Sequence, residues 1–560
     1  MQKLLHCCFW FLFFCFSPAL HAHETLKNAA IASAHPLATA AGKTILDQGG
    51  NAFDAAVAVA AVLAVVEPYS SGLGGGGFFL LHRARDKKQI MIDARERAPS
   101  KATPDMYRNA SGQARPRASL DGPLAAGIPG TPAGLAHLAK RYGRLPLSQS
   151  LAPAIRLAQH GFPADARYRA LAQSNLALLQ RLPETAAHFL HQQAVPEADA
   201  LVVQTNLATT LQALAKQGAA GFYRGPIAKE MVAAVTATGG IWRNADLARY
   251  RIVERRPISF QYRGMRIVSA APPSAGGVTL GEALHILERY DLTPLQAAPR
   301  MHLVAEALRR AYHDRARYMA DPDFVRMPLQ RLLSPSYAAQ RARDIDPKNA
   351  TSSAQFEAIP NVHQGNQTTH FSIVDRHGNR VAATLSINTF FGSGFVAGNS
   401  GVLLNNEMDD FAIAETGKNT YNLVHSGPNR IAPGKRPLSS MSPTFVEDAR
   451  GTLILGAPGG SRIPSMVLLA ILNYQTQAPV DIAALVSAPR YHHQYLPDRL
   501  EVEPESFSSA VLDELQLIGH VIRVNERKWG NMQAVWIERA SGKAFAASDP
   551  RGMGSGQAWY

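Results

Sequence analysis

Alternating apolar and polar residues predict a β-hairpin in the second half of the chain. Its first strand, 368–374, has apolar side chains at Phe371 and Ile373, and its second, 380–388, has them at Val381, Ala383, Leu385 and Ile387. The polar, glycine-containing stretch between the two strands is typical of a turn. A polar segment without periodic pattern, 346–367, precedes the hairpin, and about twenty such residues inside a globular protein usually serve a function.

The two strands also predict which residues face each other. Their apolar positions all carry odd numbers, and facing residues share one side of a sheet, so the numbers of paired residues sum to an even value. A three-residue loop, 376–378, with its glycine in the left-handed conformation, pairs Asp375 with Asn379. The further pairs in that register are His370 with Thr384 and Thr368 with Ser386.

Other segments have the pattern of buried helices and strands. Residues 55–66 are apolar on every side, which predicts a buried helix that is too short to cross a membrane. Helical patterns also cover 132–217, 226–250 and 301–318, and short strands are expected at 78–82, 89–93 and 452–455. The glycine run 72–77 lacks the Gly-Lys-Ser/Thr of a phosphate loop, so we interpret it as a place of close backbone packing.

The first 22 residues have the composition of a secretory signal peptide. Lys3 precedes the apolar run 7–16, which is too short for a membrane span, and Ala22 is a small residue at a plausible cleavage point. An uncleaved anchor is the alternative. All three cysteines lie in this segment, so the mature chain would lack disulfides, thiolate catalysis and zinc–thiolate sites. We therefore expect an exported protein, periplasmic or secreted, without a membrane span in its mature form.

Composition and charge narrow the class further. The chain has 560 residues, 46% hydrophobic and 18% charged, which is typical of a globular protein. Its formal net charge is +14, and a basic surface attracts acidic substrates. The basic residues are spread along the chain without an aromatic-interleaved tract, which argues against nucleic acid as a partner.

Three further motifs carry candidate chemistry. Arg95 follows a predicted strand, where a guanidinium can grip a carboxylate in bidentate fashion. Gly459 and Gly460 follow strand 452–455 and can present two backbone N–H groups, the components of an oxyanion hole. The acidic stretch 407–410 lacks calcium-loop spacing, and the adjacent histidines 492–493 point to opposite faces of a strand, so we expect no metal site.

Several of these motifs, in this order, resemble the gamma-glutamyltransferase (gamma-glutamyltranspeptidase, glutathione hydrolase) family of the N-terminal-nucleophile hydrolases. The matching segments are 50–57, 67–68 with 70–77, 95–96, 368–370, 405–411, 437–443 and 459–462. The resemblance implies an α/β fold, a four-layer αββα sandwich forming one composite domain. It also implies self-cleavage between Gln367 and Thr368, giving a heterodimer of a large subunit, 23–367, and a small subunit, 368–560.

The resemblance also implies roles for individual residues and a reaction that needs no cofactor. Thr368 would be the nucleophile, and its α-amine, freed by cleavage, would be the base. Ser386 supplies a hydroxyl where the family often has Thr. The remaining assignments are Arg95, Ser439 and Ser440 for the substrate's α-carboxylate; Asn388, Glu407 and Asp410 for its α-ammonium; Gly459 and Gly460 for the oxyanion; and Tyr421, in the insertion 415–429, as a gating residue on a lid.

The implied substrates are glutathione and other γ-glutamyl compounds, with water or an amino acid or dipeptide as acceptor. The sequence does not choose between hydrolysis and transpeptidation. A cephalosporin (glutaryl) acylase of the same superfamily is the nearest rival, but its substrate lacks the α-amine that Glu407 and Asp410 would bind. The chain could also be a processed but inactive periplasmic binding protein, or a basic partner for acidic polymers, which would need a cleft without a lid.

Overall fold

The computed structural model describes residues 25–113, 115–356, 367–412 and 427–560. The predicted signal peptide and Tyr421 lie outside the described residues. Within them, no helix combines the length and the apolar character that crossing a membrane requires.

Seven antiparallel strands form the sheet that contains the predicted hairpin. The hairpin strands lie at its centre, and the first and last strands of the chain pair at one edge. In spatial order the strands are β18 (Ser555–Trp559), β1 (Ala29–Ser33), β9 (Gln367–Val374), β10 (Arg380–Asn388), β2 (Gly76–Arg83), β3 (Lys88–Asp93) and β6 (Val253–Arg255).

A second sheet of six antiparallel strands packs against the first. Its strands, in spatial order, are β17 (Ala544–Ser548), β16 (Gln533–Glu538), β12 (Gly451–Gly456), β11 (Thr444–Glu447), β8 (Met265–Ser269) and β7 (Ile258–Tyr262). Val374 and Ala382 of the first sheet share a buried apolar cluster with Phe445, Ile454 and Val535 of the second.

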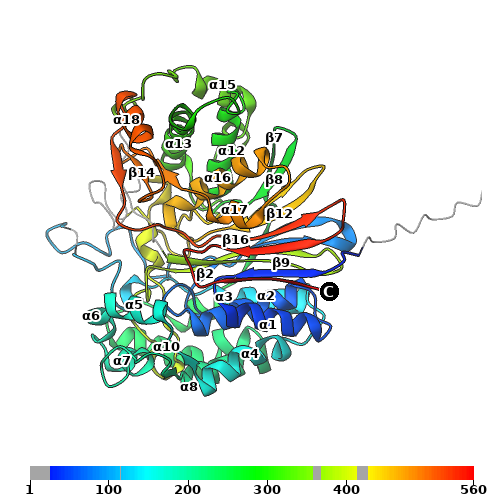
Figure 1. The fold of residues 1–560 in the computed structure, drawn as a ribbon. Helices are drawn as coiled ribbons and strands as arrows, with labels where there is room; N and C mark the ends of the chain where they lie inside the picture. The colour runs from blue at the N-terminus through cyan, green and yellow to red at the C-terminus, as the bar shows by residue number, and fades with distance from the viewer. Residues whose placement is uncertain (1–24, 114, 357–366, 413–426) are drawn as a thin grey trace, which may run out of the picture.

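Helices cover the outer face of each sheet, so the chain has a mixed α/β fold, as predicted (Figure 1). The seven-stranded sheet packs on a layer that includes α1 (Pro36–Asp47), α2 (Ala52–Val66), α3 (Thr131–Arg141), α4 (Leu147–His160) and α8 (Thr205–Gln217). The six-stranded sheet packs on α12 (Gly276–Leu287), α13 (Ala297–Tyr318), α16 (Ile463–Thr476) and α17 (Ile482–Ser487).

The smaller elements lie around these layers. They include α5 (Ala166–Ser174), α10 (Gly225–Ala237), α11 (Asn244–Arg249), α15 (Pro335–Ala342) and α18 (Ser509–Leu517), with the short strands β13 (Tyr491–His492), β14 (Leu500–Val502) and β15 (Ile522–Val524). Another short pair, β4 (Phe162–Pro163) and β5 (Leu201–Val202), interrupts the segment predicted to be helical throughout.

Helix α2 confirms the prediction made from its apolar run, and every one of its residues is buried. It begins three residues earlier than expected, because the Asn51 side chain caps it and the Asp54 carboxylate accepts a hydrogen bond from the Asn51 N–H. The Asp375 carboxylate also accepts a 2.9 Å hydrogen bond from Ala52 N–H. The turn of the central hairpin is thereby tied to the start of the central helix.

The hairpin register is confirmed over most of its length and wrong at its open end. Asp375 N–H donates to the Asn379 carbonyl, and His370 pairs with Thr384 as predicted. Leu385 still pairs with Thr369, but the next pair is Asn388 with Gln367. Two residues, Ser386 and Ile387, therefore lie opposite Thr368 alone, as in a β-bulge, instead of the predicted pairing of Thr368 with Ser386.

The glycine run beside this bulge packs as the sequence predicts. A Cβ on Gly75 would lie 2.0 Å from the Ser386 carbonyl oxygen, and one on Gly74 would lie 1.9 Å from the Leu403 carbonyl oxygen. Only glycine permits this approach of three backbone segments. The run thus leaves space for the irregular end of the hairpin, where Asn388 has a positive φ of 78°.

Candidate active site

Thr368 lies at the start of β9, beside the bulge, with 6% of its surface exposed. The Ser386 hydroxyl donates a 2.7 Å hydrogen bond to the carbonyl oxygen of Gln367 and accepts one of 2.7 Å from Asn388 N–H. No hydrogen bond between described residues involves the Thr368 hydroxyl. The bulge therefore places the second hydroxyl on the carbonyl that precedes Thr368, and leaves the Thr368 hydroxyl available.

A small inner cavity brings together most of the residues that the sequence assigned to the site. Besides Thr368, it is lined by Arg95, Ser386, Asn388, Glu407, Asp410, Ser439, Ser440, Met441, Gly460 and Ile463. These residues come from β9 and β10 of the first sheet, from the start of α16 and from loops that lie more than 300 positions apart. Gly459 lines the neighbouring cavity instead, and Tyr421 is outside the described residues.

Arg95 is the buried centre of an ion-pair cluster in this cavity. Its guanidinium lies 2.6 Å from Glu407 Oε2, 2.5 Å from Asp410 Oδ2 and 3.4 Å from Glu96 Oε2. It also donates to the carbonyls of Pro437 and Leu438, next to Ser439. The sequence assigned Arg95 and the two acids to opposite ends of a substrate, whereas here they pair directly.

Electrostatics in the cluster favour an added positive charge. Burial, together with the charge of Glu407, raises the pKa of both Glu96 and Asp410, although Arg95 opposes this. One guanidinium thus faces three carboxylates. Three acceptors there, Asn388 Oδ1, Glu407 Oε1 and Asp410 Oδ1, are buried, and no described residue donates a hydrogen bond to them. An ammonium group offers three donors and one positive charge, so it suits this arrangement.

Arg315 is a functional candidate that the sequence pattern did not reveal. It lies within α13, is buried, and donates a 3.1 Å hydrogen bond to Ser440 Oγ. Its Nε and Nη1 groups have no acceptor among the described residues, and burial lowers the pKa of Arg315 to about 10. The residue type gives no sign of burial, because most helical arginines are solvated. The spacing is the signal that could have found it: Arg315 lies three residues after Tyr312 and so shares the inward face of α13.

The histidine of the Thr-Thr-His motif has a structural role. His370 Nδ1 lies 2.8 Å from Thr384 Oγ1, and its Nε2 lies 3.2 Å from Ser372 Oγ. Burial lowers the pKa of His370 to about 3, so the ring is neutral. Since both ring nitrogens are engaged away from Thr368, this histidine is not placed to act as its base. Thr369 is also engaged, donating to Glu67 at 2.8 Å.

Gly459 and Gly460 lie directly beyond β12, beside Thr368, and line the two cavities that Thr368 separates. Gly459 has a φ of 139°, which side-chain-bearing residues rarely adopt. Neither N–H group donates to another described residue. Two free N–H groups at this position fit the predicted oxyanion hole.

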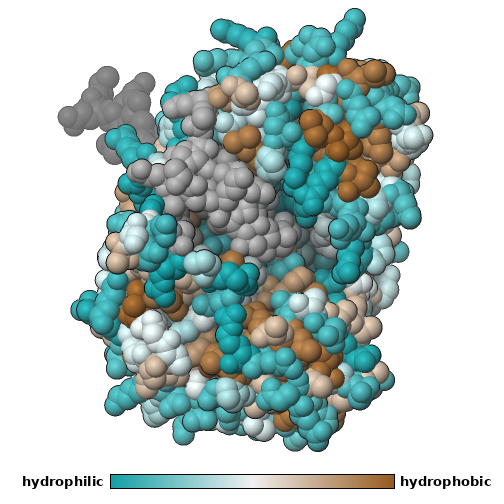
Figure 2. Space-filling view, turned by 90° about the vertical axis from the view of Figure 1, so that its left-hand side faces the viewer, coloured by the Kyte–Doolittle hydropathy of each residue, from teal (hydrophilic) through white to brown (hydrophobic). Residues whose placement is uncertain are grey.

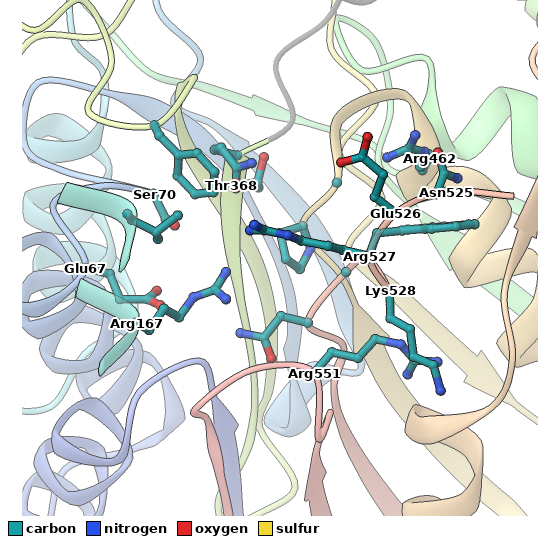
Figure 3. A pocket seen from close by; sticks show the side chains of 18 of the residues that line it. Glu67, Ser70, Arg167, Thr368, Arg462, Asn525, Glu526, Arg527, Lys528 and Arg551 are labelled. Atoms are coloured by element: carbon teal, nitrogen blue, oxygen red, sulfur yellow. The ribbon is translucent and has the colours of Figure 1, made fainter. Parts of the chain in front are cut away.

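A larger outer cavity of about 440 Å³ lies on the other side of Thr368 (Figure 3). Its walls include Glu67 and Ser70 on one side and the segment 525–531 on the other. The space-filling view of this side of the molecule shows a hollow between its upper and lower halves, bordered by hydrophilic residues (Figure 2). Thr368 therefore stands between a small charged cavity and a wide, accessible one.

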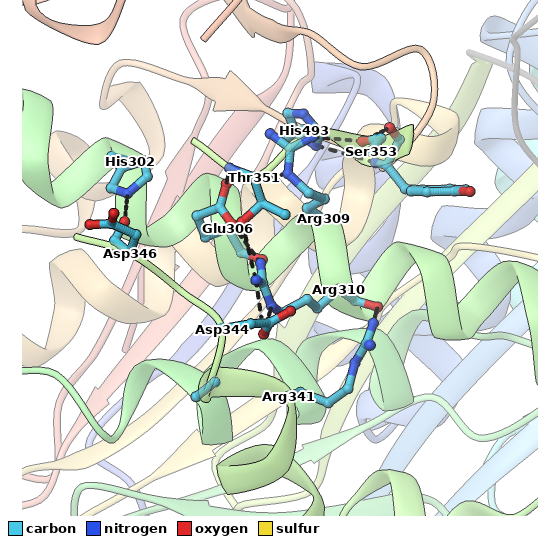
Figure 4. A network of polar contacts seen from close by, with 12 residues as sticks. His302, Glu306, Arg309, Arg310, Arg341, Asp344, Asp346, Thr351, Ser353 and His493 are labelled. Atoms are coloured by element: carbon cyan, nitrogen blue, oxygen red, sulfur yellow. Dashed lines mark hydrogen bonds and ion pairs between the residues drawn. The ribbon is translucent and has the colours of Figure 1, made fainter. Parts of the chain in front are cut away.

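Elsewhere, His302, Glu306 and His520 have ligand atoms within 4.8 Å of one another, a donor set that a metal ion could use. These ligand atoms already form hydrogen bonds within the protein, however, and Figure 4 shows those of His302 and Glu306. His302 Nε2 donates to the Asp346 carbonyl, so its Nδ1 accepts from His520 Nε2 at 2.9 Å. Glu306 is engaged by Arg309, Arg310 and Thr351. The two arginines disfavour a cation there, and the cluster is best explained as structural.

Comparison with known proteins identifies the family. The model of the gamma-glutamyltranspeptidase family matches residues 38–559. The chain belongs to the gamma-glutamyltranspeptidase family. The glutathione hydrolase proenzyme of Escherichia coli is 41% identical over 95% of this chain and 92% of its own length, and that of Pseudomonas aeruginosa is 39% identical over 95% of both.

Solved structures agree with this membership. A cephalosporin acylase from Bacillus halodurans superposes with a TM-score of 0.83 at 28% identity, covering 96% of each chain. The resemblance inferred from the motifs is thus confirmed for the family and for the mixed α/β fold. Because gamma-glutamyltranspeptidases and this acylase share the fold, the fold alone does not choose between their substrates.

Proposed function

We propose that this gamma-glutamyltranspeptidase cleaves the γ-glutamyl amide bond of glutathione and related compounds, with Thr368 as nucleophile. The observation that carries the proposal is the position of Thr368 between the inner and outer cavities. The inner cavity matches the charges of a γ-glutamyl group, and the outer one has room for the rest of the substrate. Family membership and relatives of the same activity along nearly the whole chain support it.

The precursor activates itself in this proposal. The Thr368 hydroxyl attacks the Gln367 carbonyl carbon, the C–N bond breaks, and the nitrogen takes up the proton to become an α-amine. The Ser386 hydrogen bond stabilises negative charge on the Gln367 oxygen during this step. Water then hydrolyses the ester, leaving Gln367 as a carboxylate and Thr368 as a new N-terminus. The products are the subunits 23–367 and 368–560.

Cleavage supplies the base for catalysis. Before it, the Thr368 nitrogen is an amide and cannot accept a proton; afterwards it is an α-amine, a group whose ordinary pKa is about 7.7–8.0. The amine accepts the hydroxyl proton as the oxygen attacks the γ-carbonyl, and the Gly459 and Gly460 N–H groups stabilise the oxyanion. The protonated amine then protonates the departing nitrogen. Water or an acceptor amine resolves the γ-glutamyl ester by the reverse steps.

A zwitterion can enter the inner cavity without changing its charge balance. Its α-carboxylate would replace Glu407 and Asp410 at the Arg95 guanidinium and accept from Ser439 and Ser440. Its α-ammonium would satisfy the acceptors of Asn388, Glu407 and Asp410, which lack donors. Arg315 positions the Ser440 hydroxyl. The ion pairs of Arg95 with Glu407 and Asp410 therefore stabilise the site until the substrate carboxylate replaces the two acids at Arg95.

A cephalosporin acylase is the second candidate, because the solved structure with that activity has the same fold. A glutaryl group has the carboxylate of a γ-glutamyl group but no α-amine. It would leave the acceptors of Asn388, Glu407 and Asp410 unsatisfied next to an added negative charge, which is unfavourable. The structure of the cavity therefore favours γ-glutamyl over glutaryl substrates.

We also propose that the sheets and helices form the four-layer αββα sandwich of the N-terminal-nucleophile hydrolases, completed by both subunits. Export to the periplasm, after removal of residues 1–22, follows from the composition of the N-terminus. An N-terminal sequence of the protein recovered from the periplasmic fraction tests both the cleavage site and the location.

The decisive experiment compares wild type with Thr368→Ala. Wild type should run as two bands on a denaturing gel and release glutamate from glutathione, and added glycylglycine should divert part of the product to γ-glutamyl-glycylglycine. The variant should stay a single band and release no glutamate. Two bands from the variant would show that another group cuts the chain, and glutamate release by the variant would exclude Thr368 as nucleophile.

A further inference from the structure

The outer cavity carries an excess of positive charge that the proposed reaction does not use. Its cationic lining residues are Arg167, Arg462, Arg523, Arg527, Lys528 and Arg551, and its carboxylates are Glu67 and Glu526. Arg462 pairs with Glu501, and Arg551 pairs with Glu503 and Asp549, so these two are neutralised locally. Arg167, Arg523, Arg527 and Lys528 form no ion pair with a described residue.

The unpaired cations approach from both sides of the cavity. Arg167 comes from α5 and Arg527 from the loop between β15 and β16, and Figure 3 shows both extending toward the middle of the cavity below Thr368. The charge of Arg167 works to lower the pKa of Glu67, which burial raises, but the two residues form no ion pair. Two guanidinium groups directed into one space are favourable when an anion lies between them.

Several hydrogen-bond donors in the same walls lack an acceptor in the part of the chain that the structure describes. They are the buried atoms Arg167 Nε, Asn525 Nδ2 and Trp529 Nε1. Only 9% of Trp529 is exposed, so its indole N–H has little access to water. A buried donor without an acceptor costs free energy that a bound acceptor would recover. Charge and donors thus point to the same kind of ligand, a carboxylate.

The geometry of the proposed reaction indicates which carboxylate would bind in the outer cavity. With the γ-glutamyl group in the inner cavity and its γ-carbonyl at Thr368, the departing amine must lie on the opposite side, in the outer cavity. An acceptor amine attacks the ester from the position that the departing amine has left, so it occupies the same cavity. Peptides and amino acids in either role carry a carboxylate within a few bonds of that nitrogen.

We propose that the outer cavity is a carboxylate-binding subsite. It makes the enzyme specific for departing and accepting amines that carry a carboxylate, with Arg167 and Arg527 as the main specificity-determining residues. The inference rests on the proposed function. It assigns glutathione's glycine carboxylate to this subsite, and it makes neutral amides and cationic dipeptides poor partners. Because Arg527 is exposed, the preference weakens as salt increases.

A matched pair of substrates tests the subsite. Glutathione and glutathione with its glycine carboxylate converted to the primary amide differ only in that carboxylate. We expect wild type to favour glutathione by about tenfold or more in kcat/KM at low ionic strength, as for one charge-assisted hydrogen bond. Arg167→Gln and Arg527→Gln should each bring this ratio closer to one, and Arg527→Lys should restore part of it.

The ratio is taken within each variant, so partial loss of folded protein cancels. Lys216→Gln, which removes an exposed charge on α8 away from the cavity, should keep the wild-type ratio. A wild-type ratio near one, or an unchanged ratio in both arginine variants, would overturn the subsite. γ-Glutamyl-4-nitroanilide, whose leaving group has no carboxylate, separates the two proposals. If the enzyme cleaves it but the ratio of kcat/KM for glutathione to that for the glutathione amide is near one, only the subsite is rejected. If the enzyme cleaves none of the three substrates, both proposals are rejected.

Discussion

The hydroxyl of Ser386 donates a 2.7 Å hydrogen bond to the carbonyl oxygen of Gln367, the residue whose peptide bond precedes Thr368. The contact exists because the hairpin ends in a bulge, which sets Ser386 and Ile387 opposite one residue of β9. In a regular ladder Ser386 would stand beside the nucleophile. Here it contacts the carbonyl group that Thr368 attacks in the proposed self-cleavage.

Removing this hydroxyl should slow self-cleavage. In Ser386→Ala the oxyanion formed on Gln367 loses a donor, and loss of one such donor typically costs about 10²–10³-fold in rate. The conversion of precursor to two subunits, followed on denaturing gels after purification of uncut chain, measures it. Ser386→Thr keeps a hydroxyl and should cleave at close to the wild-type rate; equal rates for the Ala variant and wild type would contradict the role.

Replacing Glu407 by Gln should weaken selection for the α-amine. The variant keeps the shape of the side chain but removes one of the charges that face the ammonium, so KM for γ-glutamyl substrates should rise about tenfold or more. The advantage of γ-glutamyl-4-nitroanilide over glutaryl-4-nitroanilide should shrink in kcat/KM. Asp409→Asn is the matched control, because this neighbouring buried acid is not among the lining residues. An undiminished preference in Glu407→Gln would place the ammonium elsewhere.

Gly459→Ala should lower kcat by about 10²-fold, the typical effect of losing one oxyanion donor. The glycine has a φ of 139°, a conformation that an alanine rarely adopts, so the backbone must change there and move the N–H group. Gly239→Ala controls for backbone strain alone, since Gly239 has a φ of 91° with open space around it. Steady-state kinetics on γ-glutamyl-4-nitroanilide, with thermal unfolding of both variants, separate lost catalysis from lost stability.

Local sequence patterns correctly predicted the elements that depend on neighbouring residues. The apolar run of α2 becomes a fully buried helix, and the parity of Phe371, Ile373 and their partners across the turn fixes most of the hairpin. The bulge escaped prediction because the backbone of Gly75, some 300 positions earlier, approaches Ser386 and makes the irregular pairing possible. A contact between such distant segments has no signature in the alternation of β10.

The candidate site was predicted as a set of residues, but not as a set of contacts. Motif resemblance named Arg95, Glu407 and Asp410, and these do line one cavity. That Arg95 pairs with both acids depends on how two loops meet, which charge pattern alone does not say. Arg315 was missed because a buried arginine within a helix looks, in sequence, like a solvated one.

As the pH falls from 6.5 to 4.5, the buried histidines should contribute a loss of stability. Burial, with neighbouring positive charge, lowers the pKa of His520 to about 3, and burial lowers the pKa of His492 and His493 to about 4. The unfolded chain binds protons on these residues below a pH of about 6.5, whereas the folded chain does not, so stability is fully present above that pH and falls below it. Each histidine contributes a loss of about 1.4 kcal/mol per pH unit in this window.

Carboxylates held at low pKa, such as Glu501 at about 2, affect stability only below about pH 4.5. Acids with a raised pKa, such as Asp409 at about 7, do titrate in this window, but they do so alike in wild type and in a histidine variant, so the difference between the two proteins isolates the histidine. His520→Gln removes one titrating group, and its ring partner His302 keeps a neighbouring amide donor. The variant should be less stable than wild type at pH 7.5, and the difference should shrink as pH falls to 5, by about 1.4 kcal/mol per unit below 6.5. Urea unfolding at pH 7.5, 6.5, 5.5 and 5.0 measures it. Parallel stability curves for the two proteins would mean that His520 is protonated in the folded state, against its burial and its hydrogen bond to His302.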